Sequence, residues 1–286
     1  MPDSAQIEEI VDRALAEDLG GGDVTTEALI SEDRQGKASI VVKQEGILAG
    51  ADVARKVFQA VDPELRVDVL IEDGAQVKPG SVITRVQGRA ASILKAERVA
   101  LNFLQMLSGI ASETNRYVKA VEGSPVRIMD TRKTTPGLRV LEKYAVKLGG
   151  GKNHRMNLAD GILIKDNHIA ELRSGGLSLK EILDRARANA PRRLKVEIEV
   201  RTVPEAREAA EAGADIIMLD NMSLKDMRLA VKSIQGRTLI EASGGITLDR
   251  VRAVAETGVD FISVGALTHS AKALDISLEF EPASGQ

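Results

Sequence analysis

Apolar positions in the first third of the chain recur at two different spacings. In some segments they return every three to four residues, which is typical of helices that bury one face. In others, short β-branched runs lie between turn residues and indicate strands. The pattern predicts helices over residues 6–18 and 52–61 and strands over residues 38–43, 66–71 and 81–86.

A long helical tract follows over residues 91–121. The Ser108-Gly109 pair predicts a break within this tract, because Gly is a poor helix former. We interpret the tract as the hinge between a first α+β domain and the rest of the chain.

After Gly123-Ser124-Pro125 the predicted elements alternate between strand, loop and helix. Six short apolar runs predict strands over residues 126–129, 161–164, 194–198, 215–219, 238–241 and 260–264. Helical segments between them cover residues 178–189, 203–212, 224–234 and 248–256. This alternation favours a parallel sheet covered by helices. A repeat, residues 211–220 resembling residues 256–265, favours a closed or nearly closed barrel.

Composition limits the classes of protein that remain. The 286 residues suffice for one large domain or two moderate ones, and a hydrophobic content of 43% supports a core. Aromatic residues make up only 2%, which argues against a nucleic-acid binder built on stacking. The net charge of -3 argues against a global basic field. The absence of Cys excludes disulfides, thiolate catalysis and Cys-ligated zinc.

Neither the N-terminus nor any apolar run carries a targeting signal. Met1-Pro2-Asp3-Ser4 lacks the basic and apolar regions of a signal peptide. No apolar stretch reaches the ~18 residues that suggest a membrane span. We therefore expect a cytoplasmic protein with no membrane and no nucleic-acid partner.

Cationic side chains follow short apolar runs between residues 130 and 168: Arg132, Lys133, His154, Arg155 and Lys165. The residue just past a parallel strand faces the active-site end of the sheet. Cations repeated at that position indicate a local pocket for a substrate with several negative charges. The alternative for the Arg132-Lys133 pair is a solvated loop. For the nearby His168, a structural hydrogen bond is an equal alternative to a ligand role.

Two carboxylates arrive after strands in the same way, Glu199 after residues 195–198 and Asp220 after residues 216–219. A polyanion site that also holds acids indicates phosphorylated-sugar chemistry, with a divalent metal as an option. Both could be surface carboxylates, but their place just beyond buried strands favours the pocket. Glu197 alternates with Glu199 and could point into the barrel interior or bind a neighbouring cation.

Two glycine segments follow the last predicted strands. Ser243-Gly244-Gly245 precedes a helix expected to start near Thr247, and Ser263-Val264-Gly265 precedes His269. Such glycines let backbone N–H groups approach a phosphate, and a helix N-terminus adds a favourable dipole. Ordinary glycine turns are the alternative. Their occurrence at consecutive strand ends favours phosphate, which barrel enzymes often bind with their last two loops.

Taken together, several segments resemble the quinolinate phosphoribosyltransferase family, also called nicotinate-nucleotide pyrophosphorylase (carboxylating). They run through almost the whole chain in order, and the block over residues 130–168 is the most specific. The matching segments are residues 15–26, 97–111, 130–139, 147–168 and 219–222, together with the two glycine segments.

The resemblance implies an α/β protein of the type II phosphoribosyltransferase kind. The N-terminal α/β sandwich domain would comprise residues 1–110, and an open α/β barrel of about seven strands would comprise residues 111–270. A C-terminal tail over residues 271–286 would pack on the first domain.

The resemblance also implies a reaction. Quinolinate and 5-phosphoribosyl-1-pyrophosphate (PRPP) give nicotinate mononucleotide, pyrophosphate and carbon dioxide, as a step of NAD biosynthesis. The family's dicarboxylate-binding positions resemble Arg98, Arg132, His154, Arg155 and Lys165. Its phosphoribosyl and pyrophosphate positions, with the glycine segments, resemble Lys133, Glu199, Asp220, Ser243, Gly244, Gly245, Ser263, Gly265 and His269. The implied catalytic residues are Lys133, Lys165, Glu199 and Asp220, the last two also as ligands of the Mg²⁺ that accompanies PRPP.

The resemblance further implies a homodimer or a higher oligomer, in which Arg98 of one subunit serves the other's site. Val99 and Met106 stand where many relatives have Thr and Arg, so this subunit contact can differ in detail.

Three other functions remain as alternatives. One is a transferase of the same fold that acts on nicotinate or a molybdenum-linked ligand. Another is a phosphate-binding barrel aldolase or isomerase with Lys165 as a Schiff-base residue. The third is a sensor that binds PRPP without turnover.

Overall fold

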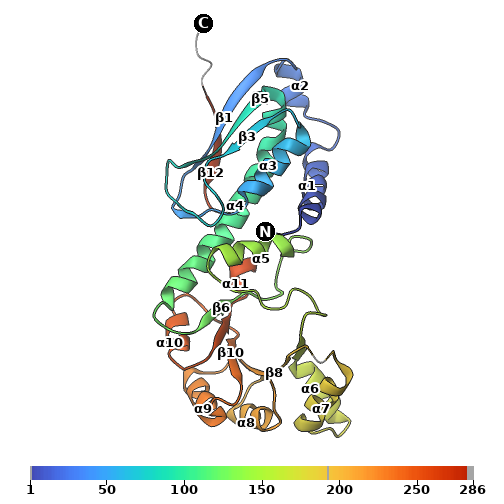
Figure 1. The fold of residues 1–286 in the computed structure, drawn as a ribbon, viewed down its shortest axis with the longest axis vertical. Coiled ribbons are helices and arrows are strands. Elements are labelled where there is room, and N and C mark those ends of the chain that lie inside the picture. Colours follow the sequence, from blue (N-terminus) through green and yellow to red (C-terminus); the bar gives the residue numbers. More distant parts are fainter. Residues whose placement is uncertain (1, 192, 282–286) are drawn as a thin grey trace. The chain divides into compact units, whose positions relative to one another are not determined.

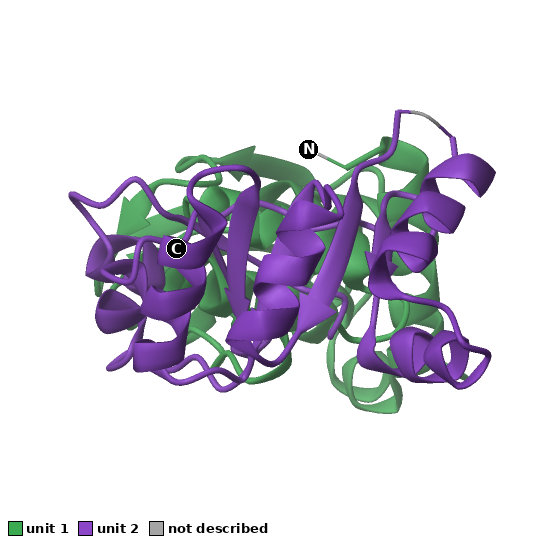
Figure 2. Cartoon of the chain, turned by 90° about the horizontal axis from the view of Figure 1, so that it is seen from below, with its two compact units in different colours: residues 1–115, 134–150, 267–286 green, residues 116–133, 151–266 purple. Residues whose placement is uncertain are grey.

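The structure is a computed structural model that describes residues 2–191 and 193–281. The chain divides into two compact units, coloured separately in Figure 2. Unit 1 comprises residues 1–115, 134–150 and 267–286, and unit 2 comprises residues 116–133 and 151–266. Each unit is therefore assembled from separate stretches of sequence. Residues 282–286 of the predicted C-terminal tail lie outside the described residues.

Unit 1 is built on a four-stranded antiparallel sheet in the order β12-β1-β5-β3. The strands are β1 (Gln35–Val42), β3 (Arg66–Val69), β5 (Val82–Arg89) and β12 (Ile276–Phe280). A two-stranded sheet pairs β2 (Gly46–Ile47) with β4 (Gln76–Val77). The helices are α1 (Ser4–Leu19), α2 (Val24–Leu29), α3 (Ala51–Val61), α5 (Arg139–Leu148), most of α4 (Ala90–Ala120) and α11 from residue 267 (Ala266–His269). The helices predicted over residues 6–18 and 52–61 are confirmed as α1 and α3, whereas α2 and α5 were not predicted.

The predicted break in the long helix is wrong, because α4 runs without interruption from Ala90 to Ala120. The Ser108 hydroxyl accepts a hydrogen bond from the Ala49 N–H (3.0 Å) and donates one to the Ala49 carbonyl (3.1 Å). A Cβ atom at Gly109 would collide with the carbonyl oxygen of Lys272. The two small residues thus let other backbone segments of unit 1 approach the helix, and they do not end it.

Unit 2 is built on a six-stranded parallel sheet in the order β6-β11-β10-β9-β8-β7. The strands are β6 (Arg127–Met129), β7 (Ile162–Ile164), β8 (Val196–Val200), β9 (Ile216–Asp220), β10 (Leu239–Ser243) and β11 (Phe261–Ser263). The helices are α6 (Asp166–Ser174), α7 (Leu179–Asn189), α8 (Val203–Glu211), α9 (Leu224–Ile234) and α10 (Val251–Ala255). Neighbouring helices such as α8 and α9 pack side by side (Figure 1). The predicted parallel α/β arrangement is confirmed, and α6 is an addition to it.

Local sequence explains why these elements form where they do. The apolar centre of β9, Ile217 to Leu219, is buried, as expected for a parallel strand covered on both faces. Helices α7 and α8 each begin with a capping box, Ser178 with Glu181 and Thr202 with Glu205. The box at Thr202 ends the short loop after β8, and the box at Ser178 ends the loop between α6 and α7.

The sheet of unit 2 has a seventh position that is not a named strand. Lys152 forms an isolated parallel bridge with Met129, with hydrogen bonds from the Lys152 N–H to the Ile128 carbonyl (2.8 Å) and from the Asp130 N–H to the Lys152 carbonyl (3.1 Å). Lys152 therefore extends the sheet beyond β6, on the side away from β11. The predicted open barrel of about seven strands is realised as six strands and this single bridged residue.

No helix within residues 2–191 and 193–281 is long and apolar enough to cross a membrane.

Candidate active site

A pocket of about 400 Å³ opens at the carboxyl ends of the unit 2 strands. Every residue that lines it belongs to unit 2, and most follow or end a strand. Nine of the predicted site residues lie in this lining, namely Arg132, Lys133, His154, Arg155, Lys165, Glu199, Asp220, Ser243 and Ser263. The lining also includes Thr131, Leu163, Met218 and Glu241. Parallel strands bring their carboxyl ends to one edge, so segments far apart in sequence meet here.

Two carboxylates lie at the mouth of this pocket. Glu199 is half-buried near the end of β8, and Asp220 ends β9. Burial, and then the negative charges of Asp220 and Asp166, raise the pKa of Glu199. Carboxylates that repel one another in a pocket favour binding of a cation, because a cation removes the repulsion.

Two neighbours that sequence reasoning missed orient Asp220. The Asn221 amide donates to Asp220 Oδ1 (2.9 Å), and Arg201 Nε lies 3.5 Å from Asp220 Oδ2. Arg201 also pairs with Asp166 at 2.8 Å. Asn221 adopts a left-handed backbone (φ 54°), which Asn tolerates better than most residues. The side chain of Asn221 fills the place that a Cβ of Gly244 would need, which explains the glycine there.

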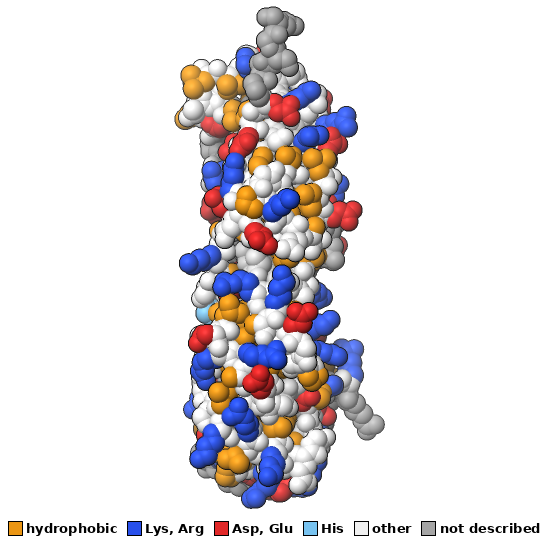
Figure 3. All heavy atoms as spheres, turned by 90° about the vertical axis from the view of Figure 1, so that its left-hand side faces the viewer, with side chains coloured by type: hydrophobic (Ala, Val, Ile, Leu, Met, Phe, Trp, Pro, Cys, Tyr) orange, Lys and Arg blue, Asp and Glu red, His pale blue; other side chains and the backbone are white. Residues whose placement is uncertain are grey.

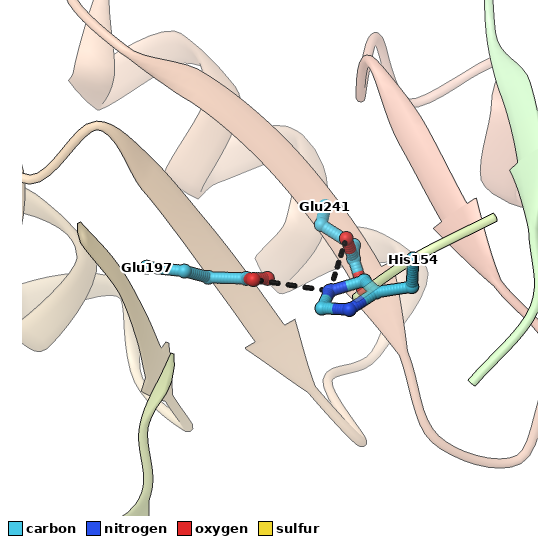
Figure 4. A group of neighbouring side chains, drawn as sticks. All are labelled: His154, Glu197 and Glu241. Atoms are coloured by element: carbon cyan, nitrogen blue, oxygen red, sulfur yellow. Dashed lines mark hydrogen bonds and ion pairs between the residues drawn. The ribbon is translucent and has the colours of Figure 1, made fainter. Parts of the chain in front are cut away.

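A second group of ionisable side chains lies deeper in the barrel (Figure 4). His154 Nε2 is 3.0 Å from Glu197 Oε2 and 3.6 Å from Glu241 Oε2, and both glutamates point toward the imidazole ring. Glu197 and Glu241 are 5% and 1% exposed. Burial and the neighbouring Glu197 raise the pKa of Glu241 to about 8. Of the two alternatives for Glu197, the barrel interior and a neighbouring cation, the structure realises the first, with Nε2 of His154 as the partner of the buried carboxyl.

Glu241 is a pocket residue that sequence reasoning missed. It lies inside β10, two positions before Ser243. The available signal was a glutamate within an otherwise apolar strand, the same signal that singled out Glu197.

The cations lie close enough to influence one another. Burial, and then the positive charge of Arg132, lower the pKa of Arg155. The Arg155 guanidinium donates to the Gly161 carbonyl (3.1 Å). On the face shown in Figure 3, basic side chains are interspersed with acidic and apolar ones. The cluster is therefore a feature of the pocket and does not continue as a basic patch across that face.

The remaining predicted residues differ in their placement. Arg98 and His269 belong to unit 1. Gly244 and Gly245 have left-handed backbones (φ 87° and 60°) directly after β10. Gly265 follows β11.

The helix predicted to start near Thr247 begins only at Val251, which corrects the expected helix N-terminus beside the glycines. The Thr247 carbonyl accepts from the N–H groups of Arg250 and Val251, so a turn occupies this stretch.

His168 has the structural role that was one of its two alternatives. Its Nδ1 accepts a hydrogen bond from the Lys165 N–H (2.9 Å) and completes the cap of α6. This contact fixes the backbone of Lys165 at the start of the helix, directly after β7.

Comparison with known proteins agrees with this geometry. Residues 23–108 match the family model described as quinolinate phosphoribosyl transferase, N-terminal domain, and residues 110–279 match the C-terminal domain model of the same enzyme. The chain is 44% identical, over 291 residues, to a quinolinate phosphoribosyltransferase (decarboxylating) of Nicotiana glauca named as mitochondrial. That match covers 96% of this chain and 82% of the relative.

Two solved structures match over nearly their full length. The NadC structure from Streptococcus pyogenes is 44% identical with a TM-score of 0.92, and the match covers 98% of this chain and 99% of that one. The nicotinate-nucleotide pyrophosphorylase of Francisella tularensis is 40% identical with a TM-score of 0.92, covering 98% of both chains.

Proposed function

The chain belongs to the quinolinate phosphoribosyltransferase family, and from this premise we propose how its pocket performs the family's reaction. The protein is a decarboxylating quinolinate phosphoribosyltransferase, a pentosyltransferase of NAD biosynthesis. The observation that carries the residue assignments is the gathering of cations and carboxylates around one pocket at the carboxyl ends of the parallel strands. The family match favours this reaction over the three alternatives, which were another substrate, an aldolase using Lys165 and a PRPP sensor.

The cations recognise the dicarboxylate. Arg132 and Arg155 supply permanent charges that suit carboxylates through paired hydrogen bonds, and Lys165 supplies a third. His154 lines the same pocket next to Arg155. A substrate with two carboxylates matches several cations, whereas a monocarboxylate would leave some of them uncompensated in the pocket.

The other half of the pocket receives PRPP. We assign the phosphates to Lys133, Ser243 and Ser263, which line the pocket, together with the backbone of Gly244, Gly245 and Gly265. Glu199 and Asp220 serve the ribose and its developing positive charge.

Magnesium enters with PRPP in this proposal. The donor set fits a hard divalent cation, because Glu199 and Asp220 offer carboxylate oxygens and the negative charge of Asp220 raises the pKa of Glu199. Bound Mg²⁺ would neutralise charge on the pyrophosphate group. Glu199 and Asp220 themselves would supply the negative charge at this edge of the sheet, and the other pocket residues would orient the substrates.

No enzyme nucleophile is needed for the transfer. The pyridine nitrogen of quinolinate attacks the anomeric carbon of the ribose, and the bond from that carbon to the pyrophosphate oxygen breaks. The resulting pyridinium accepts the electron pair of the bond to the C2 carboxylate, carbon dioxide leaves, and C2 takes a proton. Lys133 and Lys165 stabilise the anionic ends of the substrates.

We further propose a homodimer or a higher oligomer in which Arg98 reaches the partner's pocket, and a cytoplasmic location. Closure of the pocket by another subunit would exclude water and strengthen every ionic contact inside it.

The test is direct. Purified protein is incubated with quinolinate, PRPP and Mg²⁺, and nicotinate mononucleotide and carbon dioxide are measured. Parallel reactions replace quinolinate with nicotinate or omit Mg²⁺. We expect product only with quinolinate and a strong loss without Mg²⁺. Equal turnover of nicotinate would refute the dicarboxylate assignment of the cations.

A further inference from the structure

The ring of His154 is held at both nitrogens by groups of unit 2. The Arg155 N–H donates to Nδ1 (2.8 Å), and Nε2 lies 3.0 Å from Glu197 Oε2. The His154 N–H donates to Asp130 Oδ1 (2.8 Å). His154 therefore connects the segment that carries Arg155 to two other elements of the barrel, β8 and the end of β6.

These contacts determine which nitrogen carries the proton. A ring nitrogen that accepts an N–H bond has no proton of its own, so Nδ1 is unprotonated. Nε2 then carries the proton and donates it to Glu197. Hydrogen bonds at both ring nitrogens fix the orientation of the His154 ring and its position within the barrel.

The surroundings make the link to Glu197 strong. Glu197 is 5% exposed, and a hydrogen bond to a carboxylate in a dry interior is stronger than the same bond in water. Glu241 lies behind the ring, and a second cavity of about 290 Å³ lies beyond, lined by Glu197, Glu241, Arg155, Asp160, Arg193 and Lys195. His154 and Glu241 line both that cavity and the pocket, and Glu197 lines the second cavity; the three side chains are called the inner layer below.

We propose that Glu197 is a positioning residue for the substrate pocket. It holds the His154 ring, the ring holds the backbone of Arg155, and Arg155 is thereby aimed at the dicarboxylate. The inference rests on the proposed substrate-binding role of Arg155. It assigns Glu197 no contact with quinolinate or PRPP, since Glu197 is absent from the residues that line the pocket.

Steady-state kinetics of three variants test the proposal. Glu197→Ala removes the acceptor, and we expect the KM for quinolinate to rise at least tenfold while the KM for PRPP stays within twofold. Glu197→Gln keeps an oxygen acceptor for Nε2, so its quinolinate KM should return to within about threefold of wild type. Arg155→Ala is the reference for direct loss of the substrate contact.

Nitrogen-15 NMR of histidine-labelled wild-type protein tests the state of the His154 ring directly. Because this protein carries no substitution, a folding defect of a variant does not affect the result. The chain has three histidines, so His168→Gln and His269→Gln suffice to assign His154. At neutral pH we expect one protonated nitrogen, Nε2, and one unprotonated nitrogen, Nδ1. In Glu197→Ala protein the Nε2 signal should shift, and in Glu197→Gln protein it should stay near its wild-type position.

Several results would overturn the inference. They are a doubly protonated or Nδ1-protonated His154, an equal rise of both KM values in Glu197→Ala, or a Glu197→Gln variant as impaired as Glu197→Ala. A stoichiometric divalent cation in the purified protein, lost in Glu197→Ala, would also overturn it, because His154 Nε2 would then be a metal ligand. A failure of the proposed function looks different: Arg155→Ala would leave the quinolinate KM unchanged, whatever the state of the His154 ring.

Discussion

Strand β8 carries two glutamates with opposite surroundings. Glu197 and Glu199 lie two residues apart, so their side chains point to the same face at depths that differ by about 7 Å. Glu197 is buried against the ring of His154, whereas Glu199 is half-buried beside Asp220 at the mouth. The same residue type on the same strand thus has a buried hydrogen-bonded environment at one depth and a half-buried acidic one at the next.

The neighbouring strands repeat this contrast. Glu241 on β10 lies in the inner layer, where burial and the adjacent Glu197 raise its pKa to about 8. Asp220 at the end of β9 keeps 14% of its side chain exposed and lies 3.5 Å from Arg201. The buried inner layer therefore favours the protonated form of Glu241. Depth along the barrel, more than residue type, separates the two roles.

The largest effect that we expect comes from the cations that face the mouth. Arg132→Ala and Arg155→Ala should each weaken quinolinate binding by about 2–5 kcal/mol and leave PRPP binding nearly intact, because each removes a charge-assisted contact in a desolvated pocket. Titration calorimetry with each ligand separately measures this. Equal losses for both ligands would break the division of the pocket into a dicarboxylate half and a phosphate half.

The mouth carboxylates should affect a different quantity. Glu199→Ala and Asp220→Ala should reduce kcat by about 10²–10³-fold with little change in quinolinate affinity, because they act on charge that develops during transfer. Glu197→Gln in the inner layer is the matched comparison, and it should leave kcat near the wild-type value. Normal turnover of the mouth variants at saturation would contradict their assignment.

Subunit mixing tests whether Arg98 of a partner subunit completes the pocket. Arg98→Ala and Lys165→Ala proteins should each be nearly inactive, and a mixture that exchanges subunits should recover up to about a quarter of wild-type activity for an isologous dimer. One site of each mixed dimer then carries neither lesion. Exchange proven by mass spectrometry without any recovery would place Arg98 in its own subunit's pocket.

The last comparison concerns the stability of the inner layer and is measured on the folded protein without substrates. The folded protein keeps the Glu241 proton up to a pKa of about 8, whereas the unfolded chain loses it near 4.5, so the folded state binds more protons between these values. Its contribution to the free energy of unfolding is therefore full below pH 4.5 and is lost as the pH rises toward 8. The uncharged Glu241→Gln variant escapes this loss. Its Tm relative to wild type should increase from pH 5 to pH 8, and a constant difference would show that Glu241 ionises normally.

Much of unit 2 could be predicted because its signals are local. Apolar runs and turn residues indicated the strands and most helices, and the cations after those runs indicated the pocket. The helix break predicted at Ser108-Gly109 failed because the reason for these residues is long-range. Ser108 bonds to Ala49, and Gly109 makes room for the carbonyl of Lys272. Nothing near Gly109 in the sequence indicates that contact.

The sequence by itself determined the family, the α/β class and the residues that gather at the strand ends. It could do so because parallel strands place the residues after them at one common edge. Only the tertiary structure decided how deeply each side chain is buried and which side chains contact one another. His154 lies between Glu197 and Glu241. Arg201 and Asn221 hold Asp220. These relations join residues on different strands and loops. Their free energy depends on burial and distance, which a linear pattern of residues does not contain.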